Sequence, residues 1–220
     1  DIRITADGEL VLFHDEDARR AAGCSRRIGD MNWGEVRRLR VFGGHGVPHL
    51  KDALEFMALW PSGDIYFDLR GGGRRLVEAL VRAIAPSGLW RRCFILDFYS
   101  KRRSLLHARS LDSRVNLSVM PGGPWNIAPS AHLAGVQSLC LGWGGPITRA
   151  LYKAASFFYG ARSAVARVKA MGISVSAGVV NTPEDIRYLL SQGACGIWTD
   201  DLILARRTLA NVPSNGPSPR

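Results

Sequence analysis

Residues 65–96, IYFDLRGGGRRLVEALVRAIAPSGLWRRCFIL, contain the pattern that indicates the fold. A strand-length apolar run opens the stretch at 65–70, and a second run closes it at 93–96. Between the two runs, apolar residues recur at helical spacing, at Leu76, Val77, Leu80, Val81 and Ile84. A strand, an amphipathic helix and a second strand in this order are typical of an α/β domain.

The same alternation continues on both sides of this stretch. Further strand-length runs occur at 115–119, 136–141, 173–180 and 195–199, and a second helical pattern covers 50–58. Helix starts are predicted at Asn32, which has Glu35 three residues later, and at 181–185, where a cap residue precedes Pro183. Repeated strand-helix units fit either an open doubly wound sheet or a closed (β/α)8 barrel. No G-x-G-x-x-G motif follows a strand, which disfavours dinucleotide binding.

The charge of the chain restricts the classes of partner. Its 220 residues have a formal net charge of +10, with 46% hydrophobic and 22% charged residues, as in ordinary globular domains. This charge would attract phosphates on lipids or small substrates, but no nucleic-acid-binding motif is present.

The four cysteines have no metal-ligand spacing. No signal peptide or membrane-spanning segment is apparent, which favours a cytoplasmic or membrane-peripheral location and leaves the compartment open.

Two regions contain side chains suited to chemistry. The first fifteen residues, DIRITADGELVLFHD, are predicted to form two strands around a tight turn at Asp7 and Gly8, which would bring Asp1 and His14 to one cavity. In the strand at 65–70, period-two alternation places Asp68 and Arg70 on one face. A divalent cation with a bound phosphate would satisfy both charges. A structural Asp-Arg pair and a packed histidine are the alternatives.

Five landmarks in order give the chain a family resemblance. They are Asp1-x-x-x-Thr5-x-Asp7-Gly8 with 11–15, then 47–54, 67–70, 179–181 and 196–201. Together they resemble the glycerophosphodiester phosphodiesterase family over nearly the whole chain. Residues 33–40 and the Asp at position 68, where most members have Glu, are similar to the fungal branch of phosphatidylglycerol phospholipase C.

The resemblance implies a (β/α)8 TIM barrel with its active site at the carboxyl ends of the strands. By position, Asp1 and Asp68 would be metal ligands, His14 the general acid that protonates the leaving alcohol, and Arg70 a phosphate clamp. The implied cofactor is a divalent metal ion, Mg²⁺ or Ca²⁺, because the ligands are oxygen atoms. The implied substrate is a glycerophosphodiester or an anionic glycerophospholipid, with peripheral membrane contact and no nucleic acid.

The chain also departs from the family pattern. The His-Arg pair of the family's first strand and the Glu two residues before Asp1 have no counterpart, which predicts a barrel lacking its first strand, first helix and part of its second strand. Arg70 replaces a lysine, and Gly178 and Val179 replace a tryptophan and a threonine. The barrel domain is expected to cover 1–210, and 211–220 to form a flexible Pro/Ser-rich tail.

Two functions of different classes follow from these residues. The first is a metal-dependent phosphodiester hydrolase, of which this chain would be a segment. The second is a catalytically inactive barrel that binds anionic lipid or phosphate, motivated by the departures at Arg70 and Gly178. A sphingolipid-cleaving relative on the same barrel is a third reading, which the closing Thr199-Asp200-Asp201 fits less well.

Overall fold

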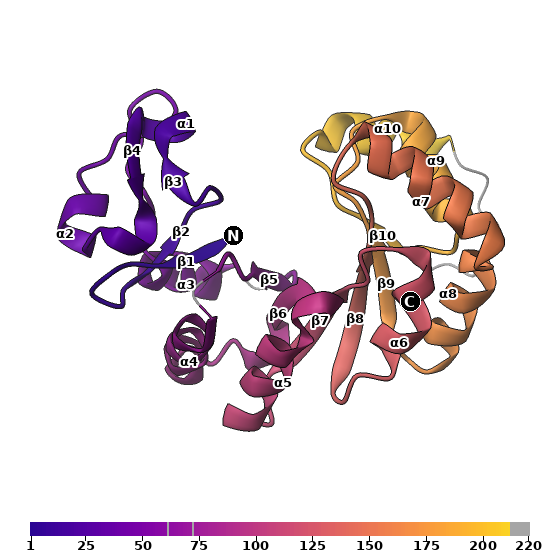
Figure 1. Ribbon diagram of the computed structural model, residues 1–220, viewed down its shortest axis with the longest axis horizontal. Coiled ribbons are helices and arrows are strands. Elements are labelled where there is room, and N and C mark those ends of the chain that lie inside the picture. Colours follow the sequence, from indigo (N-terminus) through magenta and orange to yellow (C-terminus); the bar gives the residue numbers. More distant parts are fainter. Residues whose placement is uncertain (61, 72, 212–220) are drawn as a thin grey trace. The chain divides into compact units, whose positions relative to one another are not determined.

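The computed structural model describes residues 1–60, 62–71 and 73–211 (Figure 1). The chain forms two compact units. Unit 1 contains Asp1–Asp97 and Lys101–Ser118, and unit 2 contains Phe98–Ser100 and the chain from Val119 onward. The last helix ends at Ala210 and Asn211 caps it, and the rest of the predicted tail, 212–220, lies outside the described residues. No helix in the described part of the chain has the length and hydropathy needed to cross a membrane.

Unit 1 begins with the predicted hairpin. Strands β1 (Ile2–Ile4) and β2 (Leu10–Leu12) pair antiparallel, with Ile2 opposite Leu12. The predicted tight turn at Asp7 and Gly8 is confirmed, since the amide of Gly8 donates to the carbonyl of Thr5 over 3.1 Å and the amide of Thr5 donates to the carbonyl of Glu9 over 2.9 Å. Gly8, with φ of +95°, supplies the left-handed conformation that the loop needs.

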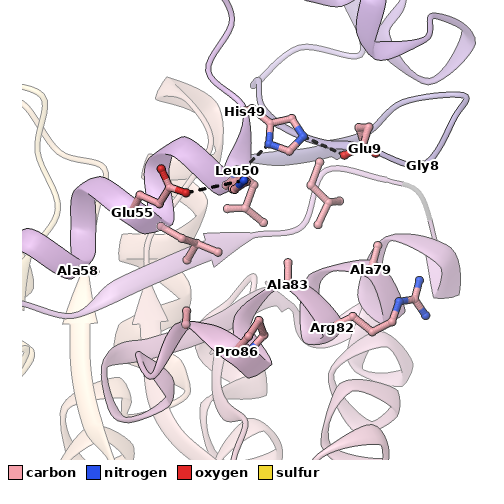
Figure 2. Close-up of a pocket in the computed structure, with 14 residues that line it drawn as sticks. Gly8, Glu9, His49, Leu50, Glu55, Ala58, Ala79, Arg82, Ala83 and Pro86 are labelled. Carbon is pink, nitrogen blue, oxygen red and sulfur yellow. Dashed lines mark hydrogen bonds and ion pairs between the residues drawn. The ribbon is translucent and has the colours of Figure 1, made fainter.

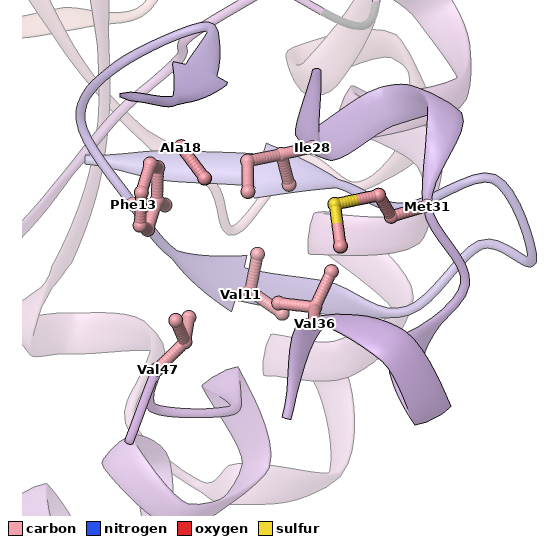
Figure 3. Close-up of a cluster of buried hydrophobic side chains, with 7 residues drawn as sticks. All are labelled: Val11, Phe13, Ala18, Ile28, Met31, Val36 and Val47. Atoms are coloured by element: carbon pink, nitrogen blue, oxygen red, sulfur yellow. The ribbon is translucent and has the colours of Figure 1, made fainter. Parts of the chain in front are cut away.

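A small subdomain follows the hairpin. It consists of β3 (Asp17–Ala18), α1 (Arg19–Ala22), β4 (Cys24–Arg27), the 3₁₀ turn η1 (Ile28–Asp30) and α2 (Trp33–Val36). The predicted capping box is confirmed, because Asn32 accepts from the amide of Glu35 and the Glu35 carboxylate accepts from the amide of Asn32. A cluster of buried side chains fixes the subdomain to β2, as Figure 3 shows: Val11, Phe13, Ala18, Ile28, Met31, Val36 and Val47.

The rest of unit 1 contains the βαβ pattern from which the sequence analysis began. Helix α3 (Leu50–Leu59) precedes β5 (Ile65–Asp68), α4 (Gly73–Ile84), the 3₁₀ turns η2 (Ala85–Ser87) and η3 (Trp90–Arg92), and β6 (Cys93–Phe98). Strands β5 and β6 pair in parallel, with Ile65 opposite Cys93. The five predicted apolar positions of α4 are all buried. After the 3₁₀ turn η4 (Tyr99–Lys101), helix α5 (Arg102–Leu111) packs against α4.

Unit 2 is also built from parallel strands and helices. Strand β7 (Asn116–Met120) runs from unit 1 into unit 2 and is followed by the 3₁₀ turn η5 (Pro124–Asn126) and α6 (Ile127–Ala131). Strand β9 (Ser174–Ala177) pairs in parallel with β8 (Val136–Leu141) on one side and β10 (Gly196–Ile197) on the other. Its helices are α7 (Pro146–Phe158), α8 (Ala161–Ala170), α9 (Pro183–Ser191) and α10 (Leu202–Ala210).

The predicted α/β class is therefore confirmed, and each predicted strand is present with small changes at its ends. The run at 173–180 ends as a strand at Ala177, because Gly178 has φ of +146° and leaves the extended conformation. At 181–185 the capping residue is Thr182, whose hydroxyl accepts from the amide of Asp185, and Pro183 is the first helical residue.

Candidate active site

The hairpin brings Asp1 and His14 to the same end of unit 1. Beyond the paired residues of β1 and β2, the amide of Phe13 donates to the carbonyl of Asp1 over 3.2 Å. This bond continues the antiparallel ladder past β2, so that His14, the next residue, leaves the hairpin beside Asp1. The predicted proximity of the two segments is present in the structure.

The end of β5 lies beside β1. Leu69 forms a parallel bridge with Ile2, and the amide of Arg70 donates to the carbonyl of Ile2 over 3.0 Å. These contacts join residues that are nearly seventy positions apart in the sequence. They place the carboxyl end of β5, with its Asp68 and Arg70, next to the first residue of the chain.

The guanidinium of Arg70 bridges the two predicted metal ligands. Its Nε donates to Oδ1 of Asp1 over 2.7 Å, and its Nη2 lies 2.8 Å from Oδ2 of Asp68. All three side chains are partly buried, so the two ion pairs are less screened by water than pairs on an open surface. Three of the four predicted site residues thus contact one another directly.

The electrostatics of Asp68 show that His14 belongs to the same neighbourhood. Burial raises the pKa of the Asp68 carboxyl, and the nearby positive charges, of which Arg70 is the strongest, oppose this rise. His14 and Lys101 are among the groups that act on the pKa of Asp68. A partly buried carboxylate surrounded by cationic groups is typical of sites that bind a charged ligand or metal.

His14 is held by residues to which the sequence analysis gave no role. Its Nδ1 lies 2.6 Å from Oδ1 of Asp15, and Arg20 donates to both oxygens of Asp15 over 2.7 and 3.1 Å. The hydrogen bonds from Arg20 and His14 lower the pKa of Asp15 to about 2. Because ionised Asp15 can only accept, the Nδ1 of His14 carries a proton, and Nε2 is the nitrogen left to exchange one with a ligand.

Arg3 is the second residue that the sequence reasoning missed. Its Nη2 donates to the carbonyl of His14 over 2.8 Å, and its Nη1 donates to the carbonyl of Arg70 over 2.9 Å. One side chain therefore ties the end of the hairpin to the end of β5. Arg3 lies two residues after Asp1, between the buried Ile2 and Ile4, so the two side chains share one face of the strand. This alternation is the sequence signal that could have identified Arg3.

The donor set determines which metal the site could hold. In the described ranges 1–60, 62–71 and 73–211, no group of three or more His, Cys, Asp or Glu side chains is arranged to hold a metal ion. Asp1 and Asp68 nevertheless offer two carboxylates in one place. Mg²⁺ is commonly bound by one or two carboxylates, with water and substrate phosphate as its other ligands, whereas Ca²⁺ takes six to eight oxygen ligands. The residues present therefore fit Mg²⁺ better than Ca²⁺.

Two other landmarks of the sequence have structural roles. The carboxylate of Asp7 accepts from the amide of Trp33 over 3.0 and 3.1 Å, which joins the tip of the hairpin to the start of α2. In unit 2, the side chain of Asn181 bonds to Thr199 over 2.9 Å and to Asp200 over 2.8 Å. These bonds connect the segments that follow β9 and β10, so the landmarks at 179–181 and 196–201 form one hydrogen-bonded network.

Unit 1 also contains a cavity of about 570 Å³ that is separate from these residues. It lies between the tip of the hairpin, α3 and α4, as Figure 2 shows. Its lining includes Glu9 and His49, whose Nε2 lies 2.9 Å from Glu9 Oε2 while its Nδ1 accepts from the amide of Lys51. None of the four predicted site residues lines it.

Comparisons with known proteins show which family the chain resembles. Residues 1–69, which contain Asp1, His14 and Asp68, match the model of the "Glycerophosphoryl diester phosphodiesterase family". A curated protein of Mycobacterium tuberculosis, "Probable glycerophosphodiester phosphodiesterase 2", is 29% identical over 122 residues. The match covers 56% of this chain and 44% of that relative, so this chain spans less than half of the relative's length.

Solved structures extend the likeness to the whole fold. A protein from Silicibacter pomeroyi that carries the same family's name matches with a TM-score of 0.78 and 20% identity, covering 96% of this chain and 81% of that one. An Oleispira antarctica phosphodiesterase, solved with the product sn-glycerol-3-phosphate, matches with a TM-score of 0.72 and 18% identity, over 96% and 83% of the two chains. The chain thus resembles the glycerophosphodiester phosphodiesterases in the sequence of its first 69 residues and in its fold.

Proposed function

We propose that this chain forms the catalytic part of a phosphodiesterase that hydrolyses glycerophosphodiesters. The observation that carries the proposal is the meeting of Asp1, Asp68 and Arg70, with His14 close enough to act on the pKa of Asp68. A phosphodiester needs a cation to neutralise its charge and an acid to protonate its leaving alcohol. The family match over 1–69 supports the same activity.

Each residue has a role that follows from its contacts. Arg70 presents a planar set of donors that match two oxygens of a phosphate, so it would orient the diester and stabilise the charge that develops on it. His14, held through Nδ1 by Asp15, would give a proton from Nε2 to the departing glycerol or alcohol oxygen. Arg3 is a positioning residue, because it donates hydrogen bonds to the backbone carbonyls of both Arg70 and His14.

We further propose that the activity depends on Mg²⁺ held by Asp1 and Asp68. The bound ion would polarise a nonbridging phosphoryl oxygen. Both carboxylates pair with Arg70, and a divalent cation beside them would compete with these pairs for the same oxygens, leaving the guanidinium available to a phosphate. Chelation is then expected to lower the rate of hydrolysis, and added Mg²⁺ to restore it.

The finer substrate class is a proposal of the same kind. The resemblance of 33–40 and Asp68 to the phosphatidylglycerol phospholipase C branch favours an anionic glycerophospholipid that keeps its acyl chains, which would require peripheral contact with a membrane. The prediction that the barrel begins upstream of Asp1 stays a prediction. It is tested by reading the coding sequence before residue 1 for a His-Arg pair and a Glu-x-Asp motif.

The decisive experiment measures turnover of glycerophosphoglycerol and of phosphatidylglycerol in detergent micelles, with Mg²⁺ or with a chelator. His14→Ala is expected to lower kcat by about 10²–10⁴-fold, and Arg70→Met by about 10²–10³-fold. Arg114→Met is the matched control, because Arg114 is also paired with a carboxylate, Asp112 at 2.7 Å, outside the site. This control is expected to keep the rate.

The alternative function, an inactive barrel that binds phosphate or anionic lipid, gives a different result. It is motivated by the replacement of a family lysine by Arg70 and of a tryptophan by Gly178. In that case no variant and no metal would change the rate, while titration calorimetry would still detect sn-glycerol 3-phosphate binding that Arg70→Met weakens. Equal slow rates in all proteins, without such binding, would contradict both functions.

A further inference from the structure

Helix α7 in unit 2 has its polar and apolar faces reversed. Tyr152 and Ser156, each 5% exposed, form its inner face. Beside them, Lys153 Nζ lies 2.7 Å and Arg149 Nη1 3.1 Å from the carboxylate of the buried Asp185 in α9. The ordinary surface helix of a globular protein buries its apolar stripe and exposes its charges. In α7 the cationic side chains are instead directed to a partner in the body of the unit.

The opposite face of α7 is apolar and exposed. Ile147, Leu151 and Phe158 follow at i, i+4 and i+11, which places them on one side of the helix, and they are 78%, 64% and 81% exposed. Phe157, at the end of the helix, is 85% exposed. Trp125 in η5, which packs against α7, is 51% exposed, and its ring centroid lies 5.9 Å from that of Tyr159. We call these six residues the α7 face.

The sheet does not need α7 as a cover. Both α7 and α8 lie between β8 and β9 in the sequence, as Figure 1 shows, and it is α8 that packs on β9 with four buried residues. Helix α7 packs against α8 and η5. The six residues of the α7 face therefore do not serve the core of unit 2, unlike the buried Tyr152, and clusters of exposed aromatic residues of this kind mark interaction sites.

The charge around this face identifies the kind of partner. From 113 to 183 the sequence contains no Asp or Glu and six Arg or Lys. Three of these six are already paired, Arg149 and Lys153 with Asp185 and Arg114 with Asp112. The other three, Arg162, Arg167 and Lys169, are exposed on α8, which packs against α7. A second copy of the chain would bring the same positive charge and be repelled, whereas an anionic lipid surface would be attracted. Trp, Tyr and Phe are also the residues that favour the boundary between lipid headgroups and acyl chains.

We propose that the α7 face docks unit 2 onto the surface of an anionic phospholipid bilayer. Phe157, Phe158 and Trp125 enter the boundary between headgroups and acyl chains, while the exposed Arg162, Arg167 and Lys169 of α8 attract the negatively charged headgroups. This inference concerns membrane binding alone, and it stands whether or not the chain hydrolyses a phosphodiester.

The test is co-sedimentation of the full chain with vesicles. Vesicles of equal parts phosphatidylcholine and phosphatidylglycerol are expected to bind the protein at low salt, and vesicles of phosphatidylcholine alone to bind it less. The double variant Phe157→Gln, Phe158→Gln should weaken binding to the anionic vesicles by about tenfold or more, because two aromatic side chains no longer leave water. High salt should weaken binding of both proteins.

The matched control replaces another exposed apolar pair, in unit 1. Phe56 and Leu59 in α3 are 64% and 83% exposed, and the double variant Phe56→Gln, Leu59→Gln is expected to bind as the unmodified chain does. Lipids brominated on their acyl chains provide a second measurement, since they should quench tryptophan fluorescence in the bound protein, and Trp125→Phe should remove most of this quenching.

Three results would overturn the proposal. One is equal binding of the α7 and α3 variants, and another is the absence of salt-sensitive binding to anionic vesicles. The third is a concentration-dependent dimer, seen by light scattering, that only the α7 variant abolishes, because a second copy would then cover the face. Circular dichroism establishes that each variant is folded, which is expected since all five replaced side chains are exposed.

Discussion

Asp15 is the residue through which acid should act on the candidate site. Its pKa is lowered from 3.8 to about 2 by hydrogen bonds from Arg20 and His14. Because the pKa of Asp15 is lower in the folded chain, its ionised form stabilises the fold at pH values above about 4, and this contribution is lost as the pH falls from about 4 through about 2. Asp15→Asn removes the charge at every pH.

We therefore expect the difference in the free energy of unfolding between the unmodified chain and Asp15→Asn to be present at about pH 6 and to shrink towards about pH 2. Urea denaturation at a series of pH values measures it. A difference for Asp15→Asn that stays constant down to about pH 2 would contradict the assigned ion pairs.

The residues of the site differ in how far the sequence could predict them. Alternation along 65–70 places Asp68 and Arg70 on one strand face, and this is a local property of any strand. The contact of Arg70 with Asp1 depends instead on the pairing of Ile2 with Leu69, which are far apart in the sequence. Arg3 was missed for the same reason, since its acceptors belong to two segments that only the folded chain brings together.

At the scale of elements, the cluster of Figure 3 controls where His14 lies. Phe13, the residue before His14, and Ile28 both belong to this cluster, and Ile28 is fully buried. Ile28→Ala should lower the free energy of unfolding by about 2–5 kcal/mol, because it removes buried methylene groups and leaves a cavity. Urea denaturation measures the change.

A control at the preceding residue distinguishes the effect of the cavity from that of any substitution in this part of the chain. Arg27, next to Ile28, is exposed, and its ion pair with Glu16 at 3.3 Å lies on the surface. Arg27→Ala should change the free energy of unfolding by less than about 1 kcal/mol. If Ile28→Ala costs no more than Arg27→Ala, the cluster does not stabilise the subdomain.

The sequence could predict the elements whose patterns involve residues close together in the chain, but it could not predict the role of α7. The hairpin of β1 and β2, the capping box at Asn32 and the stripe of α4 each depend on residues close together in the sequence. The exposure of Ile147 and Phe158 in α7 could not be predicted this way, since apolar residues at helical spacing ordinarily indicate a buried face. Only the position of Asp185 shows that the helix is turned with its basic side inward.

At the scale of the whole molecule, the net charge of +10 should act on the rate of association. A field of one sign raises the local concentration of oppositely charged substrate, and salt reduces this effect. Glycerophosphoglycerol has a net negative charge, whereas glycerophosphocholine carries a balancing cation and has no net charge. The rates for the two substrates should therefore depend differently on salt, whichever substrate the chain prefers at a given salt concentration.

We expect kcat/KM for glycerophosphoglycerol to fall several-fold between low and high sodium chloride, and kcat/KM for glycerophosphocholine to change much less. The ratio of the two kcat/KM values is free of any effect of salt on stability or on metal binding, because both substrates are measured with the same enzyme under the same conditions. The effect should appear in kcat/KM and not in kcat, since the field acts before the substrate is bound. A ratio that is independent of salt would show that the positive charge of the chain does not steer its substrate, and would leave an anionic surface, such as that proposed for the α7 face, as the target of this charge.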